Sequence, residues 1–313
     1  SDVCSSDLGE IFRKFQFSIE REFSQDLVTD ATRNTTKSPW RDVYGELNLT
    51  DAIQIRGGKF KVPFGLDQVS GESNLDFVNR SLGGDYLSPG RDKGVMVHGR
   101  FFKRGLNYWA GGFQHDGDNS QSTKIEGGDD TYAARATAAV FRKTGLAFLK
   151  DAQVGGSVAT TQVSDRSVLP NGLRARTVMS QFTFFEPLFV KGTRRRYGAE
   201  FDAFHGPFGA RAEYMLVTDT RNGQGLGNQD LSNARGKAWY VLGSWVVTGE
   251  KKDAPVEARH GGLGRGGYGA LELMARFDTL RFDSKLGQDP PFSNSRAETV
   301  LPNSDDVITL GFT

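Results

Sequence analysis

Arginine side chains recur on one face of several segments in which polar and apolar residues alternate. Arg100 lies between Gly99 and Phe101, while Arg135 and Arg211 each lie between alanines. The guanidinium group keeps its charge and presents a planar fork of donors, so it binds carboxylate or phosphate oxygens well. Arginines of this parity would form a row of anion-attracting groups along one polar surface: Arg56, Arg100, Arg135, Arg211 and Arg276.

Acidic residues share the parity of these arginines. Glu46, Glu200, Glu213 and Glu272 fall on the same polar face of their segments. Carboxylates this close to guanidinium groups would cancel part of their field. The pattern therefore predicts a polar surface with charges of both signs.

Residue patterns for other chemistry are weak. The 4 histidines, His98, His115, His205 and His260, have no metal-ligand spacing. No Gly-x-Ser-x-Gly nucleophile motif occurs. The glycine-rich run 261–267 lacks the preceding strand and following helix that a phosphate-binding loop needs. We expect no metal, no cofactor and no enzymatic activity.

The charge balance argues against polyanionic partners. The 313 residues contain 39 Lys and Arg against 38 Asp and Glu, a net charge of +1. Nucleic-acid binding relies on a basic surplus that this chain lacks. Glycine (39) and phenylalanine (23) are abundant, as in β-barrels, where glycine eases bends and aromatic residues gather at the membrane interfaces.

Alternation with a period of two residues predicts an all-β protein. The candidate strands are about 9–11 residues long, the length that crosses a bilayer when tilted. We expect about twelve transmembrane strands in an antiparallel barrel, each with one apolar and one polar face. The residues predicted to face lipid are Tyr197, Phe201, Phe208, Tyr214, Leu271 and Phe277.

The connections alternate between short and long, as in outer-membrane barrels. The short turns are 50–51, 103–105 and 206–207, and the long links are 24–40, 63–92 and 116–130. This order is kept only if residues 163–194 form one long external excursion. The link 249–266 departs from the rule, because it is long but falls on the short-turn side.

The first eight residues stand apart. Residues 1–8 hold the single cysteine, Cys4, and resemble the translation of a common DNA-sequencing adapter. We therefore expect the natural segment to be residues 9–313, a barrel fragment truncated at both ends.

Several short motifs, in order, resemble the phosphate-selective porin O and P family. The most specific is the run Gly57-Gly58-Lys59-Phe60-Lys61-Val62-Pro63-Phe64-Gly65-Leu66. Shorter matches follow at 79–82, 197–200, 212–214, 248–250 and 309–312. The resemblance covers most of the chain beyond residue 10.

The resemblance implies a porin in the outer membrane of Gram-negative bacteria. Such a protein is a homotrimer of barrels with about sixteen strands each, surrounded by outer-membrane lipid. It passes small ions and solutes, including anions such as phosphate. A constriction loop, here residues 63–92, folds into the barrel and narrows it.

Under this hypothesis basic residues line the channel, with Arg174, Arg176 and Arg194 near the mouth. The expected channel-lining residues are Arg56, Arg80, Lys93, Arg100, Arg135, Arg174, Arg176, Arg211 and Arg276. Residues 64–93 nevertheless hold 5 acidic and 3 basic residues, and we expect the loop acids Asp67, Glu72 and Asp76 to weaken anion selectivity.

Two other classes remain open from the residues alone. A soluble β-rich module, for instance one that binds carbohydrate, would show the same alternation with its apolar face in a core. An outer-membrane barrel enzyme would need a nucleophile near His98, the one mid-strand histidine on the polar face.

Overall fold

Thirteen antiparallel strands form one sheet, with each strand beside its neighbour in the order β1–β8, β11–β15. The computed structural model describes residues 4–11, 14–22, 39–103, 105–119, 130–142, 144, 146–165, 170–178, 182–252, 256–258, 267, 269–284, 296 and 303–313. Within these ranges no helix is both long and apolar enough to cross a membrane.

The first half of the chain supplies strands β1 to β8 and short helices in the connections. These strands are β1 (Cys4–Ile11), β2 (Phe15–Glu22), β3 (Trp40–Thr50), β4 (Ile53–Lys61), β5 (Arg91–Phe101), β6 (Leu106–Phe113), β7 (Thr131–Ala138) and β8 (Gln153–Val163). The helices are α1 (Leu66–Val69), η1 (Glu72–Asn74), α2 (Leu82–Tyr86) and η2 (Ala147–Leu149).

The second half supplies the longest strands. They are β11 (Gly192–His205), β12 (Phe208–Arg221), β13 (Leu231–Val246), β14 (Glu272–Ser284) and β15 (Asn303–Phe312). Two very short strands, β9 (Ala175–Arg176) and β10 (Thr183–Phe185), pair only with each other. They belong to the connection between β8 and β11.

The sheet has one strand more than the sequence predicts. The extra strand is β1, whose pairing with β2 runs from Cys4 to Ile11 and so includes residues that we set aside. The adapter origin of residues 1–8 stays a prediction, because strand pairing does not reveal where a sequence came from. The prediction that one long connection joins the strands on either side is confirmed, since β8 pairs directly with β11, but the connection spans residues 164–191.

The two faces of the sheet differ as alternation requires. On the outer face Tyr197, Phe208, Tyr214, Leu271 and Phe277 are exposed, and Phe201 of the same parity is half-buried. The intervening residues of the same strands point to the concave side, where most are buried. The sheet is therefore apolar outside and polar inside, the reverse of a soluble sandwich.

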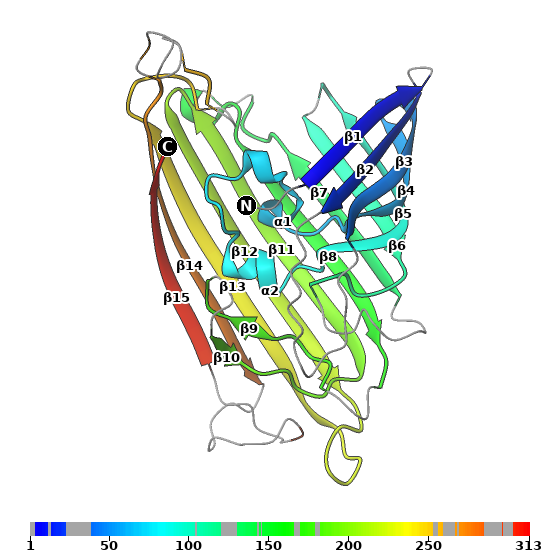
Figure 1. Cartoon of the computed structure of the whole chain (residues 1–313). Coiled ribbons are helices and arrows are strands. Elements are labelled where there is room, and N and C mark those ends of the chain that lie inside the picture. The colour runs from blue at the N-terminus through cyan, green and yellow to red at the C-terminus, as the bar shows by residue number, and fades with distance from the viewer. Residues whose placement is uncertain are drawn as a thin grey trace.

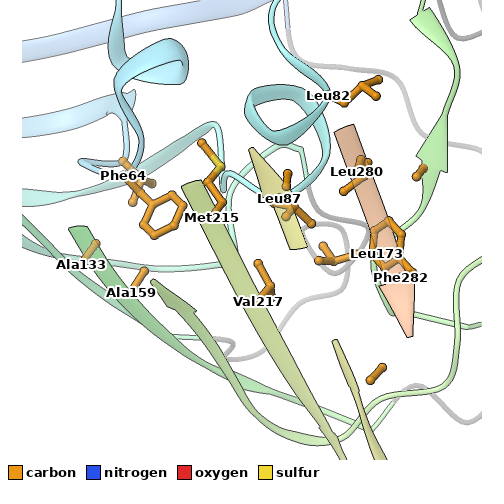
Figure 2. Close-up of a cluster of buried hydrophobic side chains, with 14 of the residues drawn as sticks. Phe64, Leu82, Leu87, Ala133, Ala159, Leu173, Met215, Val217, Leu280 and Phe282 are labelled. Atoms are coloured by element: carbon orange, nitrogen blue, oxygen red, sulfur yellow. The ribbon is translucent and has the colours of Figure 1, made fainter. Parts of the chain in front are cut away.

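The connection between β4 and β5, residues 62–90, lies on the concave side of the sheet and carries α1 and α2 (Figure 1). We call it the inward loop. Its Phe64 and Leu87 pack in one buried cluster with Met215 and Val217 of β12 and Leu280 of β14 (Figure 2). Burying these side chains fixes the loop against one part of the sheet.

Candidate functional site

The inward loop divides the inner surface of the sheet into two parts. We call the inner faces of β11–β14 the covered wall, because the loop packs on them. We call the inner faces of β2–β6 the open wall. The contacts made by the two walls decide where a solute could pass.

Carboxylates of the covered wall hold the backbone of the inward loop. Glu213 of β12 accepts hydrogen bonds from the backbone N–H groups of Leu66 (2.7 Å) and Asp67 (3.2 Å) at the start of α1. Asp278 of β14 accepts one from the N–H of Leu82 (3.2 Å) at the start of α2. Both short helices therefore begin at a wall carboxylate, which suits their unpaired N–H groups.

Arginines of the covered wall hold the loop's carbonyl oxygens. Arg276 donates to the backbone oxygens of Asn79 (2.9 Å) and Arg80 (3.2 Å), and its guanidinium lies 5.1 Å from the centre of the Phe77 ring. Arg211 donates to the backbone oxygen of Asn74 (3.2 Å). These two predicted channel-lining arginines are thus anchors of the loop.

Asp76 fastens the loop to two elements at once. Its carboxylate pairs with Arg211 of β12 (3.0 Å) and with Lys252 from the link after β13. Lys252 also pairs with Glu272 of β14 (2.7 Å), and the side chains of Asp76, Lys252 and Glu272 are nearly all buried. A buried pair of this kind is costly to break, because an uncompensated charge would remain.

The other loop charges are used within the loop or at its edge. Asp67 accepts from the N–H (2.7 Å) and hydroxyl (3.0 Å) of Ser81, and Arg80 donates to the backbone oxygens of Asp67 and Ser70. Glu72 is half-exposed and pairs with Arg41 of β3 at 2.6 Å.

Asp85, on α2, is exposed and has no ion pair with any described residue.

The open wall carries charges that pair beside a hollow. Arg56 of β4 donates to Glu46 of β3 (2.6 Å), directly opposite in register, and its guanidinium lies 4.2 Å from the centre of the Tyr44 ring. His98 of β5 contacts the same carboxylate at 3.1 Å. Arg100 pairs with Asp51 at 3.1 Å.

The hollow lies on the inner side of β2–β5. It is lined by Lys14, Gln16, Glu46, Asn48, Thr50, Asp51, Gln54 and Arg100. Every one of these side chains is polar, so the open wall suits water and hydrated ions.

The model of the family described as phosphate-selective porin O and P matches residues 8–312. The chain belongs to this porin family. It is therefore an outer-membrane channel protein of Gram-negative type, which agrees with the apolar outer face and the polar, loop-filled inner face.

Solved structures similar to this porin are outer-membrane channels and porins. The channel DcaP of Acinetobacter baumannii has a TM-score of 0.46 and 11% identity, covering 92% of this chain and 75% of that one. OmpT of Vibrio cholerae has a TM-score of 0.42 and 13% identity, covering 100% and 88%. OmpF of Salmonella typhi, in complex with daunomycin, has a TM-score of 0.42 and 9% identity, covering 100% and 89%. No curated protein matches the chain.

Some predicted channel-lining residues of this porin lie elsewhere. Lys93 is exposed on the outer face together with Val95 and Val97, because it has the apolar parity of β5. Arg80 is turned into the inward loop by its bonds to backbone oxygens. The outward position of Lys93 contradicts its predicted place in the channel, whereas the lining role of Arg80 stays a prediction.

Arg174 and Arg176 flank Ala175 in the excursion between β8 and β11, and both are half-buried. The excursion does not stay outside the barrel, since Phe185 stacks on Phe282 of the covered wall with ring centres 4.2 Å apart. The excursion therefore packs on the inner face of β14 near the end of that strand.

Arg135 bridges three strands of this porin. It binds Glu200 of β11 (2.9 Å to Oε2) across β8, and it lies 4.8 Å from the Trp109 ring centre. The bridge passes over Gly155 of β8, where an added Cβ would come within 2.7 Å of Glu200. Glycine at 155 thus leaves room for the pair.

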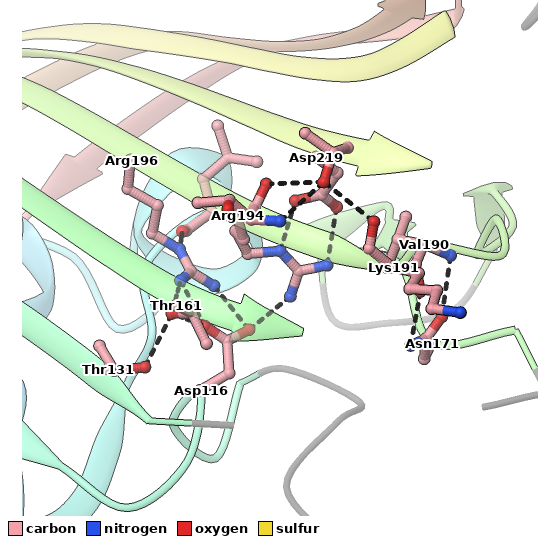
Figure 3. Close-up of polar contacts among 12 residues, drawn as sticks. Asp116, Thr131, Thr161, Asn171, Val190, Lys191, Arg194, Arg196 and Asp219 are labelled. Carbon is pink, nitrogen blue, oxygen red and sulfur yellow. Dashed lines mark hydrogen bonds and ion pairs between the residues drawn. The ribbon is translucent and has the colours of Figure 1, made fainter. Parts of the chain in front are cut away.

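Sequence reasoning missed a fully buried ionic cluster near the mouth (Figure 3). Asp116, from the link after β6, pairs with Arg194 and Arg196 of β11, and Arg194 also pairs with Asp219 of β12 (2.7 Å). Arg196 donates to the backbone oxygen of Leu87 at 2.9 Å, which ties the inward loop to the same cluster. Burial alone would raise the pKa of Asp116, but Arg196 and Arg194 hold it below its ordinary value.

A metal centre has no support in the ranges that the structure describes, where no group of His, Cys, Asp and Glu side chains could hold an ion. The site is therefore a lumen shaped by a loop and by ion pairs.

Proposed function

We propose that this porin is a general, weakly selective diffusion channel, and that solutes pass between the inward loop and the open wall. The observation that carries this proposal is the dense, buried anchoring of the loop on the covered wall, while the open wall meets it through the partly exposed pair Arg41–Glu72. Glu213, Arg276 and Asp278 hold it on the covered wall, while the hollow beside Gln16 and Gln54 lies on the other side. A polar hollow beside a fixed loop is the arrangement that a diffusion path needs.

Pairing of the arginines supports weak selectivity. Arg56 pairs with Glu46, Arg135 with Glu200 and Arg276 with Asp278. A guanidinium that already holds a carboxylate has little free field or free donor capacity for a passing phosphate. The row of basic residues therefore acts mainly as structural support.

The exposed charge on the loop has the opposite sign. Asp85 faces solvent on α2, and Glu72 is half-exposed although it pairs with Arg41. Charges at the narrowest point act at short range and are screened less than charges at the mouth. We expect these carboxylates to reduce the occupancy of phosphate in the lumen.

The test is single-channel recording of the full-length protein in planar bilayers. A small reversal potential in a KCl gradient is expected, and millimolar phosphate should reduce the chloride current only modestly. Strong anion selectivity with tight phosphate block would contradict the proposal. It would mean that phosphate displaces the carboxylates that hold the wall arginines.

We further propose that the protein has no enzymatic activity and assembles as a homotrimer in outer-membrane lipid. Family membership supports both statements. Chemical cross-linking in native outer membranes should give a ladder that ends at the trimer. A ladder that ends at the monomer would contradict the assembly.

A further inference from the structure

Aromatic side chains form a row across the outer face of β11–β13. Tyr197, Tyr214 and Trp239 are exposed there, and Tyr214 lies directly opposite Trp239 in register. Aromatic residues of this kind gather at the level of the lipid headgroups in transmembrane barrels. The row therefore marks one edge of the apolar band.

Basic residues stand on the outer face at the edge of this row nearest the long connections. Arg195 lies two residues before Tyr197 on β11, Lys237 two residues before Trp239 on β13, and Arg281 lies opposite Lys237 on β14. Arg235 lies two residues before Lys237. We call these four side chains the basic patch.

The pairing of Lys237 with Arg281 places two positive charges side by side. The two are direct cross-strand neighbours of like charge, an arrangement that is destabilising without a counter-charge. Nearby acids compensate only in part. Asp283 pairs with Arg235 (2.7 Å) and more distantly with Lys237 (3.9 Å), while Asp306 lies on the same face beyond Arg281.

Two members of the patch have no carboxylate partner among the described residues. Arg195 and Arg281 are exposed on the outer face and make no ion pair within those residues. Arginine in such a position readily binds phosphate oxygens in a bidentate manner.

The depth of the patch identifies the class of partner. Long connections lie on the external side of such barrels, so this end of β11–β14 meets the outer leaflet. A basic cluster at the headgroup level attracts phosphorylated lipid. We propose that the basic patch binds the phosphate groups of a phosphorylated lipid of the outer leaflet.

A second copy of this chain is the other occupant to test for this face. Lipid binding predicts that loss of the patch leaves the oligomeric state unchanged. A drop in oligomer content on removing the patch would overturn the lipid assignment and make this face a subunit interface.

The experiment compares two double variants of the full-length protein in detergent. Lys237→Gln with Arg281→Gln removes two charges from the patch. Lys103→Gln with Lys150→Gln removes two exposed charges on the short-turn side and is the matched control. Native mass spectrometry counts the molecules retained when lipid A, dephosphorylated lipid A or inorganic phosphate is added.

The wild-type protein should retain lipid A, and the patch variant should bind it about tenfold or more weakly. The control variant should behave like the wild type: it should retain lipid A but not dephosphorylated lipid A. Channel conductance should be the same in all three proteins, which shows that each is folded. Equal retention of lipid A by both variants, or retention of inorganic phosphate in place of lipid A, would overturn the proposal.

Discussion

The covered wall and the open wall share the same alternation of polar and apolar residues, but they differ in what their polar side chains contact. On the covered wall Glu213, Arg276 and Asp278 are buried under the inward loop and bind its backbone. On the open wall Gln16 and Gln54 stay partly exposed beside a hollow. Alternation along a strand determines that a polar side chain points into the barrel. The contacts of that side chain then determine whether it faces the solute path or supports the loop.

Two ion pairs, one near the mouth and one at a short turn, differ in the same way. Near the mouth, on the covered side, Arg194, Arg196 and Asp116 have no exposed surface at all. On the open wall the pair Arg100–Asp51 keeps much of its surface in water. Buried ion pairs depend on every partner, while exposed pairs contribute little.

The largest expected effect comes from Asp116→Asn on the covered side. This change leaves Arg194 and Arg196 buried without their shared carboxylate, which should cost about 3–5 kcal/mol of stability. The matched change on the open wall, Asp51→Asn, should cost less than about 1 kcal/mol. Urea midpoints of the full-length protein in lipid measure both. Equal costs would remove the energetic difference between the walls.

Mild acid should leave the stability contribution of the Asp116 cluster unchanged. The pKa of Asp116 lies below its ordinary value in the folded protein, so its contribution is fully present above the unfolded value of about 3.9. The contribution is lost only as the pH falls through the lower folded value. The stability difference between wild type and Asp116→Asn should therefore stay constant from neutral pH to about pH 5. A difference that shrinks over this range would show that Asp116 takes up a proton there.

A charge placed on the lipid-facing side of the sheet should cost a similar free energy behind either wall. Ala212→Arg on β12 places a charge in the apolar band and should cost about 2–4 kcal/mol near the middle of the bilayer. Val97→Arg on β5 should cost a similar amount, because Val97 lies on the exposed face of its strand. Folding titrations into vesicles compare the two. If Ala212→Arg left the folding free energy unchanged, Ala212 would have to face the lumen and not the lipid.

Loosening the loop should change conductance and also lower stability, because Asp76 and Glu272 stay buried without the charge of Lys252. Lys252→Gln removes one of the two cations that hold Asp76, so the loop can leave the covered wall more often. We expect larger current fluctuations and a changed mean conductance in single-channel records. Lys103→Gln, at an exposed position in the turn after β5, is the control and should behave as wild type. Indistinguishable records for the two variants would mean that Lys252 does not hold the loop.

The smallest effect concerns selectivity. Asp85→Asn removes an exposed loop carboxylate, and one exposed charge is worth roughly 0.2–1 kcal/mol. The ratio of chloride to potassium permeability should rise by about 1.4- to 5-fold. Asp165→Asn, in the excursion, should leave the ratio nearly unchanged. A fall in the ratio for Asp85→Asn would contradict the proposed field in the lumen.

Much of the fold could be predicted from the sequence, because alternation depends only on each strand's own residues. It located the strands and the exposed side chains such as Tyr197 and Trp239. The order of short and long connections even identified residues 163–194 as one excursion, although Arg174–Phe184 contains strand-like residues. Strand β1 was missed because its first residues were assigned to an adapter.

The site could be predicted only in part. Partial cancellation by acids was expected, and Glu46 and Glu200 do pair with Arg56 and Arg135. The roles of Lys252 and Asp116 could not be foreseen, because both come from irregular links without periodicity. Strand parity also says nothing about how a loop folds back, so the burial of Asp76 needed the three-dimensional structure.

The contacts of the inward loop also set an order of events in folding. The N–H of Leu66 bonds to a residue 147 positions later in the chain, and that of Leu82 to one 196 positions later. Such distant pairings form slowly, because a long stretch of chain must first be closed. β12 and β14 must therefore be in place before the loop can dock. The assembling barrel passes through a stage with a wide, unobstructed interior, and it acquires its narrow passage as one of the last steps.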